Sequence, residues 1–600
     1  MMRNVRLLLG IAMLALPVSS IPAPVLAAQA ETSAFASLSK RYVDGLARLN
    51  PSSATALGDH RFDTQITDMS AAGRARREAF SKAMLADLQR IDRKALSREE
   101  QVDAALLDNA LRYDIWDTET LGGWAWDPQV YNDIAGSSLY SLAARDFAPW
   151  PQRLNAATAR MAALPALLAQ ARANIVVARV PSIYATTVAK QNSGIVDIAE
   201  TMLAPHKGEL SAADAKRFDA ALVKLKAAVA EHQVWLDKTL VPGAKGDFRL
   251  GAALYDKKLG FALQSDLTRT EIKRRAQAAI VDTRAQMYAI ARQIFDAKPG
   301  ALLLPDKPTD AQQQAAIQLA LELTYAKRPP RDGMIDASTK ALAQATAFVR
   351  DKGLVGMPDS PVKIITMPKF QQGAAVAYCD SPGPLEKNLG TFFAVSPIPD
   401  DWTDAQATSF LSEYNDYMIH DLAVHEAMPG HYLQLAHANA TQSTLRAVLG
   451  SGPFIEGWAV YVEGMMADEG FMNGDPLFKL TVLKMRLRSI SNSLLDIGIH
   501  TEGMTREQAM QLMTHTAFQQ EREAAGKWVR ASLGSTQLLS YFTGYSEHMA
   551  LREEAKKRQG AAFDLKRYND ALLNHGSPPV RYVRELLFDL PISERRHSVQ

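Results

Sequence analysis

The sequence has only one cysteine in 600 residues, Cys379. A single cysteine excludes an intramolecular disulfide, a cysteine-based zinc site and a CxxC redox site. A lone thiol is also compatible with an oxidising compartment, in which paired thiols would be bridged. We therefore expect Cys379 to be a buried structural thiol.

The sequence also lacks an excess of charge of either sign, with 67 Lys and Arg side chains against 65 Asp and Glu side chains. The two surplus positive charges, Arg3 and Arg6, lie in an N-terminal segment that contains no acidic residue. Because no basic face is implied, nucleic acid is not an expected partner.

Long apolar runs are absent beyond the N-terminal segment, as are internal repeats and low-complexity tracts. No later run reaches the roughly 18 apolar residues of a transmembrane helix, so we expect no stable membrane insertion. The apolar fraction of 47% and the charged fraction of 22% are typical of globular proteins. A chain of 600 residues is long enough to bury a large core.

Residues 1–30 have the pattern of a secretory signal peptide. Arg3 and Arg6 form its charged start, and residues 7–16 (LLLGIAMLAL) form an apolar core that is short for a membrane span. Residues 28–30 (AQA) offer a cleavage site, and no nearby cysteine could carry a lipid anchor. The pattern predicts export to the periplasm or secretion; the alternative is an uncleaved N-terminal anchor.

Residues 31–350 are rich in Ala, Leu, Gln, Lys, Arg and Glu, which favour helices. Capping boxes at Ser97–Glu100 and Thr268–Glu271 mark two helix starts. The apolar residues that follow them recur at three- and four-residue spacing, as in helices that pack on one face. We expect this half of the chain to be a helical scaffold, with some of its helices lining a substrate cleft as the alternative.

The composition changes after Lys352. Residues 362–367 and 390–395 are rich in β-branched and aromatic side chains and are predicted strands, with 374–378 as a possible third. These segments predict a small antiparallel sheet, after which the chain is helical again from Thr403.

Histidines gather in the stretch DLAVHEAMPGHYLQLAH, residues 421–437. It contains His425, Glu426 and His431, and an apolar frame around them predicts a buried helix. Zinc binds neutral imidazole nitrogens and carboxylate oxygens, and a catalytic zinc keeps one position open for water. We expect His425 and His431 to be metal ligands, whereas His420 and His437 are not expected to be ligands.

The spacing H-E-A-M-P-G-H is two residues longer than the usual helical zinc motif H-E-x-x-H. On a regular helix the two imidazoles would then lie about 120° apart on the circumference and could not share one ion. Pro429 cannot donate a hydrogen bond to the carbonyl of His425, and its ring clashes there, so the helix must bulge or kink. Gly430 tolerates such a distortion. If the two extra residues loop out, His431 returns to the face of His425.

A third ligand is expected from the apolar stretch FIEGWAVYVE. Glu456 in this stretch would be costly to bury without a partner, and a cation resolves that cost. Glu463 lies seven residues later on the same face and could orient a ligand histidine.

Five sequence blocks resemble the bacterial family known as domain of unknown function 885. The blocks are HEAMPGHYLQ, FIEGWAVYVE, DIGIH (496–500), QLLSYFTGY with LREEA (537–555), and DALLNHGSPP (570–579). The likeness covers roughly residues 350–590 in motif, and it departs from the family pattern at Ser535-Thr536 and Tyr568-Asn569. The family looks like a distant relative of gluzincin zinc peptidases such as thimet oligopeptidase and angiotensin-converting enzyme.

The resemblance implies that His425, His431 and Glu456 hold one zinc ion and that Glu426 acts on a water molecule. Donors for an oxyanion are also needed. The candidates are Tyr541, Tyr545 and His500, with packing in the core as the alternative for each.

Two further substrate contacts are predicted. Arg552 could bind a substrate carboxylate, although a structural ion pair is an equal alternative. The strand that begins at Gly390 and Thr391 could pair with an extended peptide.

Together these expectations predict a mainly α fold: a large helical, zincin-like body with a deep cleft and a small antiparallel sheet beside the metal-binding helix. Residues 31–350 would be the scaffold half and 351–600 the catalytic half of one continuous body. The predicted function is a zinc-dependent hydrolase that cleaves peptides. The alternatives are a metallohydrolase acting on a small acylated substrate through another amide or ester, and an inactive periplasmic binding or scaffold protein. The sequence carries no signal for an oligomeric state.

Overall fold

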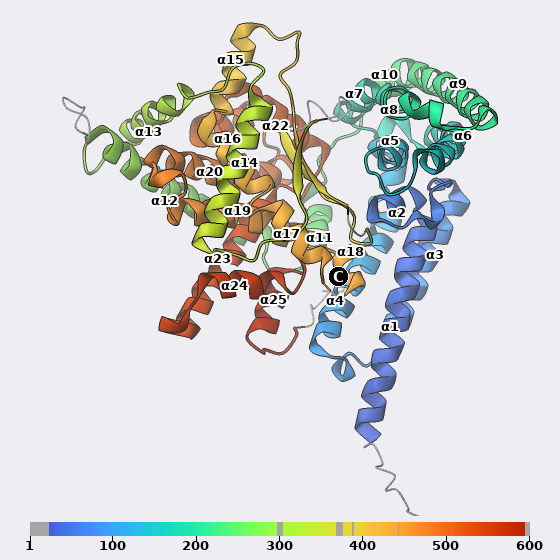
Figure 1. The fold of residues 1–600 in the computed structure, drawn as a ribbon, viewed down its shortest axis with the longest axis horizontal. Coiled ribbons are helices and arrows are strands. Elements are labelled where there is room, and N and C mark those ends of the chain that lie inside the picture. The colour runs from blue at the N-terminus through green and yellow to red at the C-terminus, as the bar shows by residue number, and fades with distance from the viewer. Residues whose placement is uncertain (1–22, 297–303, 368–375, 387–388, 442, 594–600) are drawn as a thin grey trace, which may run out of the picture.

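The computed structural model describes residues 23–296, 304–367, 376–386, 389–441 and 443–593, and it is mainly α-helical, as predicted (Figure 1). Residues 1–22 of the predicted signal segment lie outside this part of the chain. Within the described ranges, none of the helices combines the length and apolarity needed to cross a membrane.

The helices before the sheet are α1 (Ala23–Leu49), α2 (Pro51–Leu57), α3 (Ala71–Leu88), α4 (Arg98–Trp116), α5 (Gln129–Ala143), α6 (Trp150–Asn174), α7 (Ser182–Gln191), α8 (Gly194–Ile198), α9 (Ala212–Trp235), α10 (Val241–Gly243), α11 (Gly251–Leu263), α12 (Arg269–Asp296), α13 (Asp310–Tyr325) and α14 (Met334–Lys352). The helices after the sheet are α15 (Asp404–Glu413), α16 (Asp416–Glu426), α17 (His431–Asn439), α18 (Thr444–Val448), α19 (Gly452–Asp468), α20 (Pro476–Thr501), α21 (Arg506–Gln511), α22 (Glu521–Leu533), α23 (Leu539–Gln559), α24 (Leu565–Leu573) and α25 (Val580–Leu587).

Local sequence signals set several helix starts. Ser97 caps α4, and its side chain and that of Glu100 each bond the other's backbone N–H. Thr268 accepts a hydrogen bond from the Glu271 N–H at the start of α12. These contacts satisfy N–H groups that have no partner within the helix. Both predicted capping positions are therefore confirmed.

The sheet contains β1 (Val362–Thr366), β2 (Ala377–Asp380) and β3 (Thr391–Val395) in the order β1-β3-β2. β2 pairs with β3 in antiparallel fashion, but β1 pairs with β3 in parallel. The prediction of a wholly antiparallel sheet was therefore wrong in one of the two pairings. After β1 the chain forms β2, which is not adjacent to β1 in the sheet. β3 then lies between β1 and β2 and runs parallel to β1. Part of the predicted strand 374–378 lies outside the described residues.

Two of the hydrophobic cores lie on either side of the sheet. α5, α6 and α9 share one core, and α14, α16, α19 and α23 share another with the sheet. β2 lies between them: its residue Asp380 accepts hydrogen bonds from Tyr140 of α5 at 3.0 Å and from Arg145, just beyond α5, at 2.8 Å. Figure 1 shows the strands between these two groups of helices.

The packing also crosses residue 350, the predicted border of the two halves. α12 packs along α20, and α14 packs against α16. The predicted division of the chain into a scaffold half and a catalytic half stays a prediction.

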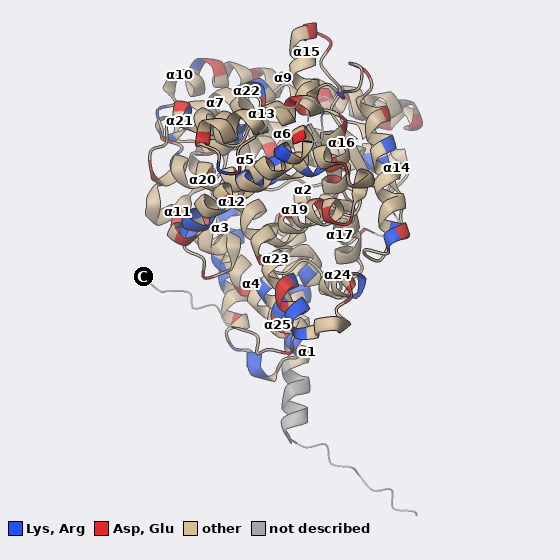
Figure 2. Cartoon of the chain, turned by 90° about the vertical axis from the view of Figure 1, so that its left-hand side faces the viewer, with Lys and Arg blue, Asp and Glu red and all other residues tan. Residues whose placement is uncertain are grey.

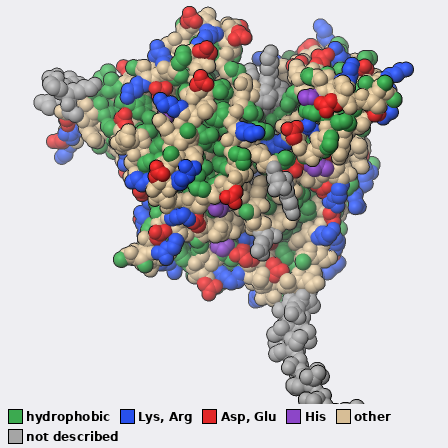
Figure 3. Space-filling model, in the orientation of Figure 1, with side chains coloured by type: hydrophobic (Ala, Val, Ile, Leu, Met, Phe, Trp, Pro, Cys, Tyr) green, Lys and Arg blue, Asp and Glu red, His purple; other side chains and the backbone are tan. Residues whose placement is uncertain are grey.

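Charges of both signs are interspersed along the helices in Figure 2 and over the face drawn in Figure 3. Neither view shows a broad patch of one sign. This mixture agrees with the near-zero net charge of the sequence.

α19 and α23 approach each other closely at two glycines. A Cβ at Gly544 would overlap the carbonyl oxygen of Pro453, and a Cβ at Gly457 would overlap the backbone of Gly544. Both helices are well packed elsewhere, so they cannot separate without losing buried contacts. This contact fixes the position of α19, which carries Glu456.

We predict that Gly544→Ala destabilises the protein by about 1–3 kcal/mol because the new methyl group forces α23 away from α19. The measurement is the midpoint of thermal unfolding. Gly136→Ala is the matched control, since Gly136 lies inside α5 with open space around it and should be neutral or slightly stabilising. Equal midpoints for Gly544→Ala and the unmodified protein would contradict the role given to this contact.

Candidate metal centre

The predicted break in the histidine-rich helix is present between α16, which ends at Glu426, and α17, which begins at His431. The N–H of Gly430 donates to the carbonyl of Val424 at 2.9 Å. A Cβ on Gly430 would overlap the carbonyl oxygen of His425, so this turn requires glycine. The indole N–H of Trp458 donates to the carbonyl of Pro429 at 2.9 Å, which ties the turn to α19.

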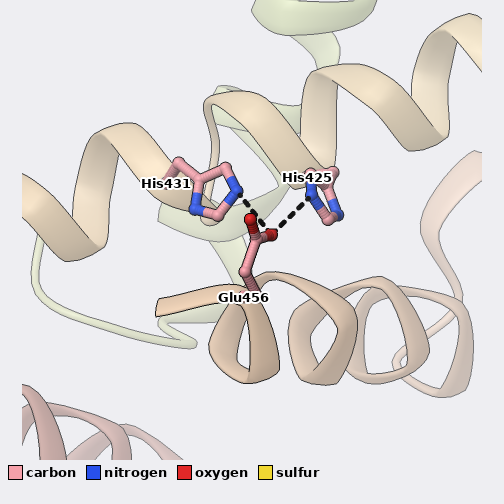
Figure 4. A group of neighbouring side chains, drawn as sticks. All are labelled: His425, His431 and Glu456. Carbon is pink, nitrogen blue, oxygen red and sulfur yellow. Dashed lines mark ion pairs between the residues drawn. The ribbon is translucent and has the colours of Figure 1, made fainter. Parts of the chain in front are cut away.

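The break brings two imidazoles and a carboxylate together, as Figure 4 shows. Oε2 of Glu456 lies 3.4 Å from Nε2 of His431 and 3.8 Å from Nε2 of His425. One ligand atom from each of the three residues lies within 4.8 Å of the others. Ligand atoms at the usual zinc bond lengths of about 2.1 Å are about 3.4 Å apart in a tetrahedron. The group therefore has the size and the donor set that a divalent ion requires.

The hydrogen bonding of these residues also fits a cation. Oε2 of Glu456 and Nδ1 of His431 are buried and have no hydrogen-bond partner among the described residues. Unpaired buried polar atoms are costly, and the carboxylate oxygen faces both histidines. A bound ion would satisfy this oxygen.

Glu463 contacts His425 on the side away from Glu456. Its Oε1 lies 2.6 Å from Nδ1 of His425, and its side chain is only 2% exposed. The Nδ1–H group of His425 would donate to this carboxylate, which leaves the Nε2 lone pair directed at the group in Figure 4. The predicted contact between Glu463 and a candidate ligand is therefore present.

Burial and charge shift the pKa values of these groups. Burial, reinforced by the adjacent His431, lowers the pKa of His425, which favours the neutral imidazole that binds metals. Burial also opposes protonation of His431, but the Glu456 carboxylate outweighs it and raises the pKa of His431. Burial raises the pKa of Glu463 to about 8.

Glu426 is the last residue of α16 and lies beside His425 in the wall of a cavity of about 400 Å³. Its Oε2 accepts a hydrogen bond from the backbone N–H of Cys379 at 3.0 Å. The Cys379 thiol itself is half-buried, and burial together with the Glu426 charge raises its pKa well above the ordinary value. This thiol is therefore protonated at neutral pH and is not a reactive thiolate.

Tyr541 is the one predicted oxyanion donor in the wall of this cavity, which it shares with His425 and Glu426. Nη2 of Arg530 donates to the Tyr541 hydroxyl at 3.1 Å. Burial, together with the Glu456 charge, raises the pKa of Tyr541 to about 12, so its hydroxyl is protonated.

Tyr545 and His500 are not placed with Tyr541. Tyr545 lies under the guanidinium of Arg486, 4.9 Å from the ring centre, and is not among the residues that line the cavity. His500 donates from Nε2 to the carbonyls of Ala531 and Gly534, at 3.0 and 2.9 Å, and lines a different cavity. The prediction of an oxyanion role for His500 is not supported, because its ring is engaged by carbonyls in the last turn of α22 and just after it.

The predicted substrate contacts also lie elsewhere. Arg552 sits 5.7 Å from the ring centre of Tyr461 and does not line the cavity. Thr391 begins β3, which follows Gly390 and is the central strand of the sheet. Both edges of β3 are occupied by β1 and β2, so the prediction that this strand pairs with a peptide was wrong.

Among the strands that the structure describes, β2 is the edge strand next to Glu426. The N–H of Ser396 donates to the carbonyl of Val376. The hydrogen bonds between β2 and β3 are therefore made by Val376 and by every second residue after it. The N–H groups of Ala377 and Cys379 then point away from β3, and that of Cys379 reaches Glu426.

The other two histidines of the motif are engaged in hydrogen bonds. Nδ1 of His420 contacts the carbonyl of Asp416, and its Nε2 contacts the Gln344 side chain, both at 2.6 Å. Nε2 of His437 lies 3.0 Å from the carbonyl of Gly356.

The sequence analysis missed the basic wall of the cavity. This wall is formed by Arg488 of α20 together with Arg522, Lys527 and Arg530 of α22. Lys527 and Arg530 are three residues apart and therefore share a helix face, which is the one signal that the sequence offered.

The comparisons with known proteins agree with the resemblance seen in the motifs. A solved structure of a candidate lipoprotein of unknown function from Shewanella oneidensis is 34% identical, covers 92% of this chain and 99% of its own, and has a TM-score of 0.77. A candidate lipoprotein from Colwellia psychrerythraea is 16% identical, covers 94% of this chain and 99% of its own, and shares the fold with a TM-score of 0.74. A comparison with curated proteins gave no match. The model of a family described as bacterial protein of unknown function (DUF885) matches residues 51–587, and the chain belongs to this family.

Proposed function

We propose that this protein is a zinc-dependent hydrolase that cleaves peptides. The observation that carries the proposal is the group of His425, His431 and Glu456, of which His425 lines the same cavity as Glu426. Two histidines and one glutamate are a ligand set typical of catalytic zinc, since three protein ligands leave a position open. When bound, the ion would polarise the scissile carbonyl and lower the pKa of a water molecule.

Glu426 would be the general base. One of its oxygens is occupied by the Cys379 N–H, which holds the carboxylate in place and leaves the other oxygen free. That oxygen can take a proton from water and later pass it to the leaving amine.

Tyr541 would stabilise the oxyanion. Because Arg530 donates to the phenolic oxygen, the Tyr541 proton is free to be donated to a substrate. Arg530 adds a positive charge beside the same position. Such fixed donors stabilise negative charge as it develops.

The outer edge of β2 at Val376 and Ala377 supports a peptide as the substrate, whereas the N–H of Cys379 further along this edge is bonded to Glu426. An extended backbone can add to an exposed strand edge through main-chain hydrogen bonds. Val376 and Ala377 line the cavity next to Glu426, so a peptide paired there would pass the general base. A small ester would gain nothing from this edge.

We also infer that the protein is exported. The relatives with solved structures are described as candidate lipoproteins, and residues 1–30 have the pattern of a signal peptide. We propose the periplasm or the medium as its location.

We predict that removal of metal with a chelator abolishes hydrolysis of a peptide library and lowers the midpoint of thermal unfolding. The stability falls because two buried imidazoles and Glu456 lose their common partner. Plasma mass spectrometry should find one zinc per chain before chelation, and added zinc should restore both properties. A purified protein with no bound metal and no gain on adding zinc would contradict the proposal.

We predict that Glu426→Gln keeps one zinc per chain but lowers kcat at least 100-fold, because the amide cannot accept the proton. Metal content and peptide turnover are measured on the same sample. Glu322→Gln, an exposed position on α13, is the matched control and should leave turnover unchanged. Full turnover in Glu426→Gln would remove this residue from the mechanism.

We predict that Glu463→Gln weakens zinc binding about 10- to 100-fold, because the neutral amide polarises the His425 ring less than a carboxylate does. Competition with a chromophoric chelator measures the affinity, again with Glu322→Gln as control. An affinity equal to that of the unmodified protein would show that Glu463 does not support the metal ligand.

A further inference from the structure

The wall of the cavity opposite Glu426 carries more cations than it has matched partners. Lys484 pairs with Glu413 at 2.8 Å, and both side chains are fully buried. Arg488 pairs with Glu523, which also accepts a hydrogen bond from the Tyr414 hydroxyl. These two pairs engage Glu523 and one oxygen of Glu413, whereas Oε1 of Glu413 has no hydrogen-bond partner among the described residues.

Lys527 is left without a matched partner. Its side chain is 4% exposed, and the nearest carboxylate oxygen, on Glu523, is 4.0 Å away. Lys527 has no hydrogen bond to any residue in the described part of the chain, yet it lines the cavity. Its ion pair with Glu523 is therefore long, and the same Glu523 oxygen also accepts a hydrogen bond from Arg488. A buried ammonium that is compensated so weakly is costly, so the position favours an additional anion.

Arg530 extends this positive site toward the candidate metal group. It lies three residues after Lys527 on α22, so the two side chains project from one helix face, about 5 Å apart along the axis. Arg530 bonds Tyr541, and its charge acts favourably on the Glu456 carboxylate. Lys527, Arg530 and Tyr541 therefore form a row that leads to His425 and Glu456.

We infer that Lys527, assisted by Arg530, binds a carboxylate of the substrate within the cavity. The row is about as long as one or two residues of an extended peptide, so the carboxylate would belong to a residue next to or near the cleaved bond. Two sources share this chemistry: the C-terminal carboxylate of the peptide, and an Asp or Glu side chain.

Several observations favour a carboxylate over a more highly charged anion. Glu413 and Glu523 also line the cavity and would repel a phosphate dianion. Arg522 is stacked 3.8 Å from the ring centre of Trp402 and is directed at that ring. Burial, together with the neighbouring charge of Arg488, lowers the pKa of Lys527 well below its ordinary value. The charge of a single bound carboxylate would favour the protonated form of Lys527 and raise this pKa again.

This inference rests on the proposed hydrolase function, and a pair of substrate comparisons tests it. Peptides with a free C-terminus are compared with their C-terminal amides, and peptides with Glu are compared with their Gln analogues. The carboxylate form of at least one pair should have a lower KM by about 10- to 100-fold, the usual effect of a hydrogen-bonded charge. The pair that discriminates identifies the source of the carboxylate. Equal KM values in both pairs would overturn the inference.

Lys527→Met tests the residue itself, since methionine keeps the length and removes the charge. The variant should keep its zinc content but lose the preference, so that its KM for the carboxylate substrate rises to that for the amide. Lys224→Met, at an exposed position on α9, is the matched control and should keep the preference. A Lys527→Met protein that still prefers the carboxylate form would overturn the assignment, and a purely structural role would change both substrates equally.

A binding measurement separates this inference from the hydrolase proposal. Calorimetry with N-acetyl-Ala-Ala and its amide, and with N-acetyl-Glu-amide and its Gln analogue, needs no turnover. If no peptide is cleaved, the hydrolase proposal fails. The anion site is still supported if one acid binds more strongly than its amide and the Lys527→Met variant loses this difference. Equal binding of acid and amide in both pairs would overturn the site itself.

Discussion

The site depends on one interruption of a helix, at residues 427–430 between α16 and α17. In an unbroken helix the rings of His425 and His431 would point in directions about 120° apart. The turn is tight enough that Gly430 leaves no room for a side chain against the His425 carbonyl. α19 holds this turn through Trp458 and also supplies Glu456, so the same helix fixes both sides of the group. The arrangement of the candidate ligands therefore depends on the packing of three helices.

Buried charge behind the histidines adds a second constraint. Glu463 and Asp421 are both buried carboxylates; burial raises the pKa of each, and the Glu463 charge raises that of Asp421 further. Neither oxygen of Asp421 has a hydrogen-bond partner within the described ranges. Two adjacent carboxylates cannot both ionise cheaply in a protein interior. A divalent cation on the other side of the His425 ring would favour the ionised form of Glu463. The two buried carboxylates, which are costly without a metal, would then help to hold the metal ligand in place.

The parts of this arrangement that could be predicted from the sequence are those encoded locally. The Pro429-Gly430 break follows from the chemistry of two residues, and Glu456 stood out as a carboxylate inside an apolar stretch. The order of the sheet could not be predicted, because β3 lies between two strands that precede it in sequence. The surroundings of His500 could not be predicted for the same reason: its residue type suggested a catalytic role, whereas the carbonyls of Ala531 in α22 and of Gly534 just after it engage its ring.

The basic wall shows why a charged residue cannot be interpreted from its own helix alone. In sequence, Lys527 follows Glu523 by four residues, which is the spacing of an ordinary surface ion pair. In the fold, Arg488 of α20 and the Tyr414 hydroxyl already occupy the Glu523 carboxylate, and Lys527 remains 4.0 Å away. A cation becomes available for a ligand only when a distant residue has taken its local partner. That competition is decided by the packing of α20 against α22, and it turns a routine helix pair into a site for an anion.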